Sequence, residues 1–250
     1  MIKIENDINW TDCILEIDLF GKDLFCDFDI TPKEFLKYAV EGISTSQEKR
    51  ERINVVLNSK LAIDCQIDSI IENLGFNYKK FGSPSINDFM QTAISDVCEG
   101  ENKKISFIHH MGIAPKLLIS QYRKIRNLLE HEYKLPTINQ AKEFVELAEL
   151  FINATNHRMG LDFYASFSLR NDKKQEKCNM YFDASEIIEG CISIRSSVCD
   201  KTFELTIEST ETIYIELLSC IIKKQFNKIP IILGHDIPEE YINIKVYGWQ

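Results

Sequence analysis

The sequence has no long apolar run, no closely paired cysteines and few of the short motifs that mark common enzymes. No stretch approaches the roughly 18 consecutive apolar residues that a membrane-spanning helix needs, and the acidic first ten residues contain no apolar core of a secretory signal. The eight cysteines are widely spaced and form no C-x-x-C pair, which disfavours a disulfide framework or a zinc site. We therefore expect a cytoplasmic protein with free thiols and no membrane partner.

Standard catalytic and cofactor-binding signatures are also missing. The chain contains no glycine-rich phosphate loop, no H-E-x-x-H and no G-x-S-x-G. His109 and His110 are adjacent, so on a regular element their side chains point apart, and no carboxylate lies within the next turn. We expect both histidines to pack in a turn or helix, and we expect neither a metal nor a cofactor.

Charge is unevenly distributed along the chain. The 250 residues are 44% hydrophobic and 27% charged, which is typical of one large or two modest globular domains, and the net charge is −9. Residues 1–102 carry 10 Lys/Arg against 19 Asp/Glu, whereas residues 103–134 carry seven Lys/Arg against two Asp/Glu, a local charge of +5. A basic segment in an acidic protein favours focused binding of an anion; the alternative is a solvated helix face.

Periodicity predicts strands first and helices next. Apolar and polar residues alternate over 13–30, which predicts a β-hairpin within residues 1–30, and a hairpin needs a larger sheet to be stable. We therefore expect it to pack on, or pair with, the C-terminal sheet. Thr31, Pro32 and Glu34 form a helix-start signal, as does Thr137 with Gln140.

The remaining pattern predicts an α+β protein with two further parts. Residues 46–74 form a long amphipathic pattern that ends at Gly75, and another helix begins near Pro115 and ends before Pro136. Short connections make an antiparallel helical bundle the natural arrangement for residues 31–157. Strand-like stretches and one helix predict a small, mainly antiparallel α+β domain of unknown role over residues 158–250.

One short segment, YRKIRNLLEHEYKLPT, combines basic, aromatic and imidazole side chains at a predicted helix end. Arginine offers a permanent charge and a two-pronged fork for phosphate oxygens, and histidine moves a proton near neutral pH. Arg126 and His131 suit a phosphodiester in this way, and Asn127 is placed to orient either group. The two side chains lie about 140° apart around an ideal helix, so they converge only if the helix bends or ends, or if a second copy supplies its own pair.

Residues 31–157 resemble the HEPN superfamily. Arg126-Asn127-x3-His131 matches its R-x4–6-H signature, and Tyr133 fits the R-x4-H-x-Y form of HEPN toxins that are paired with minimal nucleotidyltransferases. SKLAIDCQIDSIIENLG and AKEFVELAELFINAT are similar to segments of uncharacterised bacterial HEPN proteins. The resemblance implies a HEPN-like bundle, a homodimer with a composite active site, and metal-independent cleavage of RNA that leaves a 2′,3′-cyclic phosphate and a 5′-hydroxyl.

The resemblance also implies roles for individual residues. Arg126 stabilises the phosphate, His131 transfers the proton and Asn127 assists, while Tyr133 is a candidate for modification and Glu130 for support. The neighbouring side chains expected to contact RNA are Tyr122, Arg123 and Lys124. The corresponding biology is a toxin or an antiviral effector with an antitoxin or sensor protein as partner.

Two other interpretations remain open. A HEPN-like domain that binds RNA or a nucleotide without cutting it is the first, and the overall acidity argues against extended RNA contact in either case. The second is a structural or protein-interaction module, in which Arg126, Glu130 and Tyr133 form local helix pairs and His131 caps the helix end. Cationic groups are favoured at a helix C-terminus, so this interpretation needs no ligand.

Overall fold

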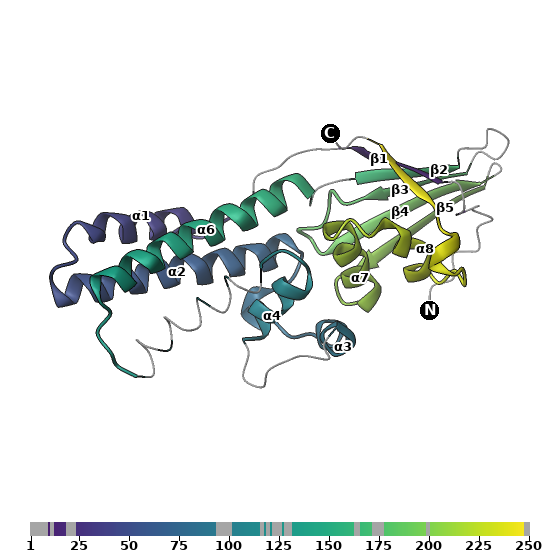
Figure 1. Ribbon diagram of the computed structural model, residues 1–250. Helices are drawn as coiled ribbons and strands as arrows, with labels where there is room; N and C mark the ends of the chain where they lie inside the picture. The colour runs from purple at the N-terminus through teal and green to yellow at the C-terminus, as the bar shows by residue number, and fades with distance from the viewer. Residues whose placement is uncertain are drawn as a thin grey trace. The chain divides into compact units, whose positions relative to one another are not determined.

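The computed structural model shows a mixed α+β fold (Figure 1). Among the described residues it contains seven α-helices and one six-stranded mixed sheet, with helices first and strands mostly in the C-terminal half. The structure describes residues 10, 13–18, 24–93, 102–115, 118, 121, 127, 132–162, 166–171, 178–198 and 201–247. Within those ranges no helix is both long and apolar enough to cross a membrane.

The chain divides into two compact units, each formed from separated segments. The first, called the helical unit here, comprises residues 23–71 and 100–159. The second, called the sheet unit, comprises residues 1–22, 72–99 and 160–250.

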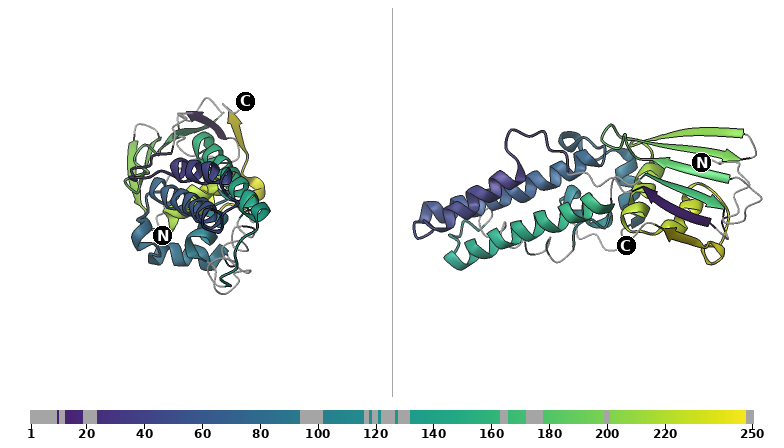
Figure 2. Two further views of the ribbon diagram at one scale, coloured as in Figure 1. Left: turned by 90° about the vertical axis from the view of Figure 1, so that its left-hand side faces the viewer. Right: turned by 90° about the horizontal axis from the view of Figure 1, so that it is seen from above.

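Four described helices build the helical unit, and two of them are long. They are α1 (Pro32–Ile43), α2 (Lys49–Asn73), α4 (Lys103–His110) and α6 (Ile138–Asp162). Figures 1 and 2 show α1 and α6 running alongside α2. The last residues of α2 and of α6 belong to the sheet unit.

Side-chain caps explain where two of these helices begin. The Thr31 hydroxyl accepts the backbone N–H of Glu34, and a Glu34 carboxylate oxygen accepts the N–H of Thr31 at 2.8 Å, which is a complete capping box. At the start of α6, Thr137 and Gln140 exchange the equivalent pair of bonds at 2.9 and 3.2 Å. Both starts agree with the sequence prediction.

The helical unit has an apolar core crossed by one polar bridge. The Gln66 side-chain amide donates to the Thr155 hydroxyl at 3.0 Å and to the Asn156 side-chain oxygen at 2.9 Å, which joins α2 to α6. A buried amide must find such partners, because each unsatisfied group costs about 1–3 kcal/mol. The apolar side chains buried in this unit include Val55, Val56, Ile63, Ile67, Ile70, Phe107, Ile108, Phe144, Phe151 and Ile152.

The sheet of the second unit combines strands from both ends of the chain. Its order is β5-β4-β3-β2-β1-β6. All neighbouring pairs are antiparallel except β1 and β6, which are parallel. The strands are β1 (Cys13–Asp18), β2 (Ser166–Asn171), β3 (Cys178–Asp183), β4 (Cys191–Val198), β5 (Lys201–Glu208) and β6 (Ile244–Tyr247).

One face of this sheet is apolar and the other carries charge. Phe167 on β2 pairs with Phe182 on β3, and their rings stack at 4.3 Å. On the opposite face, Arg195 pairs with Glu204 across β4 and β5 at 2.9 Å. The apolar face therefore needs a cover, and the strongly apolar helix α7 (Thr212–Ile222), with eight buried side chains, belongs to the same unit. The shorter elements of the unit are η2 (Tyr78–Lys80), α3 (Pro84–Ala93), η3 (Phe226–Lys228), α8 (Ile229–Ile232) and η4 (Glu239–Tyr241).

Two glycines allow two backbone segments to pass very close to each other, beside the Tyr214 side chain of α7. Gly75 follows the end of α2 with φ of 79°, and Gly190 has φ of 82°. A Cβ on Gly75 would lie 2.5 Å from the Cα of Gly190 and 2.7 Å from the Tyr214 hydroxyl oxygen. That buried hydroxyl donates to the carbonyls of Leu74 at 3.0 Å and Ile187 at 3.3 Å.

The predicted fold class is wrong in its arrangement of hairpin, bundle and small domain. Residues 24–30 form no strand, and β1 pairs instead with β2 and, in parallel, with β6. The carbonyl of Phe25 accepts the Ser69 hydroxyl at 3.1 Å, and that of Ile30 accepts the Cys65 thiol at 3.6 Å. The alternating pattern of this segment thus reflects a chain with one side against α2.

The predicted bundle also differs in its membership. Residues 72–99, including α3, group with the sheet, and α6 continues to Asp162, past the predicted end of the bundle at residue 157. The C-terminal strands are mainly antiparallel, as predicted, but they do not form the sheet by themselves, because β1 lies inside the six-stranded mixed sheet. Local periodicity does not report such pairing between distant segments.

Candidate functional site

Most of the predicted catalytic segment lies outside the described residues. This applies to Tyr122, Arg123, Lys124, Arg126, Glu130 and His131. Asn127 is helical and exposed. Its carbonyl accepts the backbone N–H of Glu132, five residues on, at 3.2 Å, a bond of the type found at helix ends.

The residues that follow the motif are open to solvent. Tyr133 is 88% exposed and has φ of 51°, in the left-handed region that a tyrosine rarely adopts. Lys134 forms an ion pair with Glu132 at 2.5 Å. The described part of this segment therefore presents polar and aromatic groups at the surface. These residues alone do not form a site.

The two adjacent histidines are held by backbone carbonyls. His109 Nδ1 lies 3.0 Å from the Ala114 carbonyl oxygen, and His110 Nδ1 lies 2.7 Å from that of Ser106. These contacts agree with the predicted packing role, but the two side chains do not point apart, because their ring centroids lie 5.4 Å from each other in an edge contact. Across the described ranges, no group of three or more His, Cys, Asp or Glu side chains is placed to hold a metal ion.

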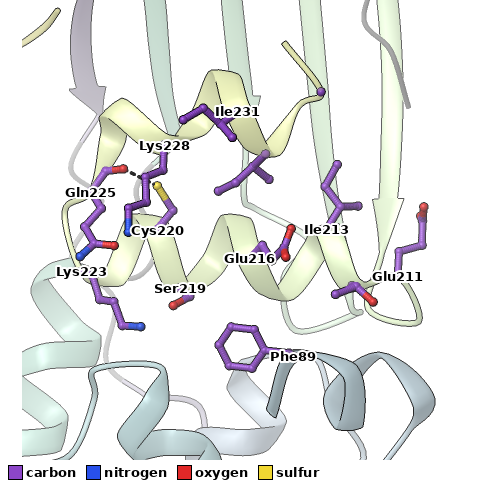
Figure 3. A pocket seen from close by; sticks show the side chains of 13 residues that line it. Phe89, Glu211, Ile213, Glu216, Ser219, Cys220, Lys223, Gln225, Lys228 and Ile231 are labelled. Atoms are coloured by element: carbon purple, nitrogen blue, oxygen red, sulfur yellow. Dashed lines mark hydrogen bonds between the residues drawn. The ribbon is translucent and has the colours of Figure 1, made fainter. Parts of the chain in front are cut away.

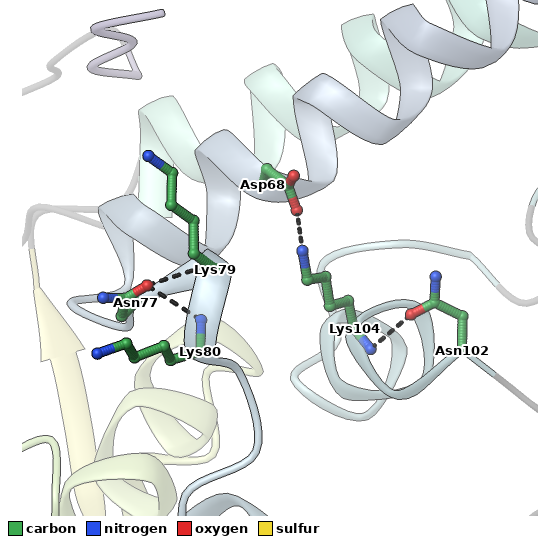
Figure 4. Close-up of polar contacts among 6 residues, drawn as sticks. All are labelled: Asp68, Asn77, Lys79, Lys80, Asn102 and Lys104. Atoms are coloured by element: carbon green, nitrogen blue, oxygen red, sulfur yellow. Dashed lines mark hydrogen bonds and ion pairs between the residues drawn. The ribbon is translucent and has the colours of Figure 1, made fainter.

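A half-buried ion pair joins two helices of the helical unit (Figure 4). Lys104 Nζ lies 2.6 Å from Asp68 Oδ1, and both side chains are 26% exposed. Burial raises the pKa of the Asp68 carboxyl, and the hydrogen bond and charge of Lys104 oppose that shift. Asn102 fixes the start of α4, because its side-chain oxygen accepts the Lys104 N–H at 3.0 Å. One of the seven cations of the basic segment is thus neutralised by a structural partner.

Figure 4 also draws a local cap in the sheet unit. The Asn77 side-chain oxygen accepts the backbone N–H groups of Lys79 at 2.9 Å and Lys80 at 3.1 Å, which starts η2. Both lysine residues are exposed. This arrangement is explained by capping alone.

A cavity with several charged groups lies in the sheet unit, beside α7 (Figure 3). Its volume is about 670 Å³, within the range usual for small-molecule sites. We call it the α7 pocket. Its lining residues are Phe89, Glu211, Thr212, Ile213, Glu216, Ser219, Cys220, Lys223, Gln225, Lys228, Ile231, Ile232 and Gly234.

Opposite charges lie at different positions along this pocket. Glu216 and Lys223 are seven residues apart on or at the end of α7, so they share a face and are separated by about 10 Å along the helix axis. Burial raises the pKa of the Glu216 carboxyl. Burial, and then the nearby charge of Lys228, lower the pKa of the Lys223 amine.

The end of α7 fixes the backbone on either side of Lys223. Gln225 N–H donates to the Cys220 carbonyl at 2.9 Å, and Lys224 N–H donates to that of Ile221 at 3.0 Å. With Lys224 at φ of 58°, this is the Schellman arrangement that closes many helices. The Cys220 thiol donates to the Gln225 carbonyl at 2.7 Å, and burial raises its pKa to about 12. The helix-terminal carbonyls are therefore already engaged, while Lys223 and Lys228 face the cavity.

Sequence reasoning missed these residues. The available signal was the placement of Glu216, Ser219 and Lys223 at spacings of three and four in an otherwise apolar helix, TIYIELLSCII. Such spacing marks one polar stripe. It does not show that α3 and the segment after α7 leave space in front of that stripe.

Comparisons with known proteins identify no relative. No protein-family model matches the sequence, and neither a curated protein nor a solved structure matches the chain.

Proposed function

We propose that this protein is a metal-independent endoribonuclease that uses Arg126 and His131. The observation that carries the proposal is the motif Arg126-Asn127-x3-His131, which resembles that of HEPN ribonucleases and lies in the basic window of +5. The exposed Asn127 and Tyr133 support it, because a polymeric substrate needs an accessible segment. The corresponding cellular role is that of a toxin or antiviral effector in the cytoplasm, with an antitoxin or sensor as partner.

The proposed reaction is an internal transesterification of RNA. The ribose 2′-oxygen attacks the adjacent phosphorus, the bond from phosphorus to the 5′-oxygen breaks, and a 2′,3′-cyclic phosphate forms. His131 takes the proton of the 2′-hydroxyl, and a water molecule protonates the leaving 5′-oxygen and is itself reprotonated from the His131 imidazolium. Arg126 stabilises the charge on the non-bridging oxygens, and Asn127 orients them.

The test is cleavage of total RNA in EDTA by purified protein and matched variants. His131→Ala should lower cleavage at least about 100-fold, because general acid–base catalysis supplies roughly 10²–10⁴ in rate. Arg126→Ala should have a loss of similar size. His157→Ala is the matched control, since His157 is an exposed histidine on α6 outside the motif. Equal cleavage by His131→Ala and wild type would contradict the assignment.

The dimer gives a second and sharper test. Because the two side chains diverge by about 140° on one helix, a composite site takes Arg126 from one copy and His131 from the other. Mixing the inactive Arg126→Ala and His131→Ala proteins should then restore part of the activity. RNA binding without products in every combination would instead favour the non-catalytic interpretation.

A further inference from the structure

The α7 pocket contains two lysines whose positive charges oppose each other. Lys223 is half-buried, and the nearby positive charge of Lys228 disfavours the charged form of its amine. No ion pair joins either amine to a carboxylate among the described residues. Two neighbouring cations in such a setting favour an anion between them, and lysine is a common phosphate ligand.

The same pocket contains the half-buried carboxyl of Glu216, which favours a hydrogen-bond donor rather than an anion. Glu216 lies two helical turns before Lys223, and burial disfavours its charged form. No hydrogen bond to its carboxylate is found from any described residue. A donor such as an amino group would stabilise that carboxylate.

Apolar side chains line other parts of the pocket. Ile213, Ile232 and Ile231 line the pocket, and Ile231 is 42% exposed. Figure 3 shows Glu216 and Ser219 on the α7 wall, with Phe89 coming from α3 below them. A flat, apolar group with polar edges fits such a wall.

We propose that the α7 pocket binds a nucleotide, with the phosphate at Lys223 and Lys228 and the amino-bearing edge of the base at Glu216. A nucleotide carries all three groups: an anion, an aromatic ring face and a hydrogen-bond donor. The cavity of about 670 Å³ is large enough for a ligand of this class. The assignment does not rest on the proposed ribonuclease activity, since all of its residues belong to the sheet unit.

The experiment is calorimetric titration of the full chain with AMP, adenosine, UMP and inorganic phosphate, at low and high salt. AMP should bind at least about tenfold more tightly than adenosine, because adenosine lacks the phosphate. High salt should weaken the binding of AMP but not that of adenosine. UMP, which lacks the exocyclic amine, should bind more weakly than AMP. Equal affinity for AMP and inorganic phosphate, or no binding of AMP at millimolar concentration, would overturn the proposal.

Matched variants assign the residues. Lys223→Gln and Lys228→Gln should each weaken AMP binding about tenfold and leave adenosine unchanged. Lys224→Gln removes the same charge one residue away, outside the pocket lining, and should have little effect. Glu216→Met should weaken AMP about tenfold and reduce its advantage over UMP. An equal loss in Lys223→Gln and Lys224→Gln would mean non-specific attraction and would contradict the site.

Folding of each variant is checked by circular dichroism before titration. If Lys223→Gln does not fold, the difference between AMP and adenosine in the wild type still decides the phosphate contact. RNA is absent from the assay, so failure here leaves the ribonuclease proposal unaffected.

Discussion

The helical unit and the sheet unit accommodate buried polar groups in different ways. In the helical unit, side chains on different helices satisfy each other, as Lys104 does for Asp68 at 2.6 Å and Thr155 for Gln66 at 3.0 Å. In the sheet unit, the buried Tyr214 hydroxyl donates to two backbone carbonyls instead. Its half-buried Glu216 faces a cavity instead. The first pattern stabilises a fold; the second leaves a polar group available to a ligand.

The difference has consequences for mutation. Where two backbone segments are in contact, an added side-chain atom collides with main chain that cannot move aside. The loss of folding stability is then large. Where two side chains pair, the partner that remains after a mutation is partly exposed to water. The loss of folding stability is therefore moderate. Where a polar group faces a cavity, its removal relieves a desolvation penalty.

The largest expected effect is that of Gly75→Ala. The new Cβ would collide with the Ile187 carbonyl and lie 2.5 Å from the Gly190 Cα, at a backbone φ of 79°. We expect a loss of more than about 3 kcal/mol in the stability of the sheet unit. Gly82→Ala is the control, because Gly82 also has a positive φ, 122°, but nothing lies within 4 Å of its Cβ position.

Hydrogen exchange detected by mass spectrometry measures this effect, because it reports the two units separately. Faster exchange should appear in the strands and α7, with α1 and the centre of α2 changed least. Equal effects of Gly75→Ala and Gly82→Ala would show that the close backbone approach is not stabilising.

The second effect is that of Tyr214→Phe. The variant keeps the ring but leaves the buried carbonyls of Leu74 and Ile187 without this donor. We expect a loss of about 1–3 kcal/mol, seen as a lower urea midpoint for the sheet unit. Tyr241→Phe, at a position that is 61% exposed, should change the midpoint little. A neutral Tyr214→Phe would mean that the two carbonyls are satisfied in another way.

The sequence predicted local starts and stops better than distant pairing. The capping boxes at Thr31 and Thr137 and the stop at Gly75 depend on a few adjacent residues, and all three are present. The hairpin failed because residues 24–30 alternate for another reason, contact with α2 on one side. The parallel pairing of Cys13 with Ile244 depends on residues more than 200 positions apart, which no local pattern encodes.

The candidate sites differ in the same way. The Arg126–His131 motif is readable because its spacing within one segment has chemical meaning, and its geometry stays a prediction. The α7 pocket could not be predicted from the sequence, because the polar stripe of α7 forms only one of its walls. Phe89 of α3 and Lys228 of η3 contribute to the others. A sequence pattern shows which face of one helix or strand is polar or apolar. A cavity depends on how several such faces pack together, which the pattern does not show.

A third prediction concerns the ion pair of the helical unit. Lys104→Met leaves Asp68 half-buried without that cation, so its pKa should rise further. We expect a loss of about 1–2 kcal/mol at pH 7. A carboxyl with a raised folded pKa destabilises the fold only when it is ionised, so the loss should vanish as pH falls below the ordinary value of 3.8.

Lys103→Met is the matched control, since Lys103 is the exposed neighbour of Lys104 at the start of α4. Urea unfolding at pH 7 and pH 3.5 measures both variants. A loss that is the same at both pH values would show that Lys104 acts through packing of its carbon chain rather than through charge.

The smallest expected effect has the opposite sign and lies in the α7 pocket. Burial raises the folded pKa of Glu216 above its ordinary value of 4.5, so ionisation at pH 7 opposes folding. Glu216→Gln removes that charge with little change of shape, and it should raise the stability of the free protein at pH 7 by about 0.5 kcal/mol or less. The gain should disappear below pH 4, where the carboxyl is protonated in both states. Glu204→Gln, at an exposed carboxylate that pairs with Arg195, should give no gain. If Glu216→Gln instead destabilises the protein at pH 7, Glu216 has a structural partner like that of Asp68, and the contrast between the two units fails at this residue.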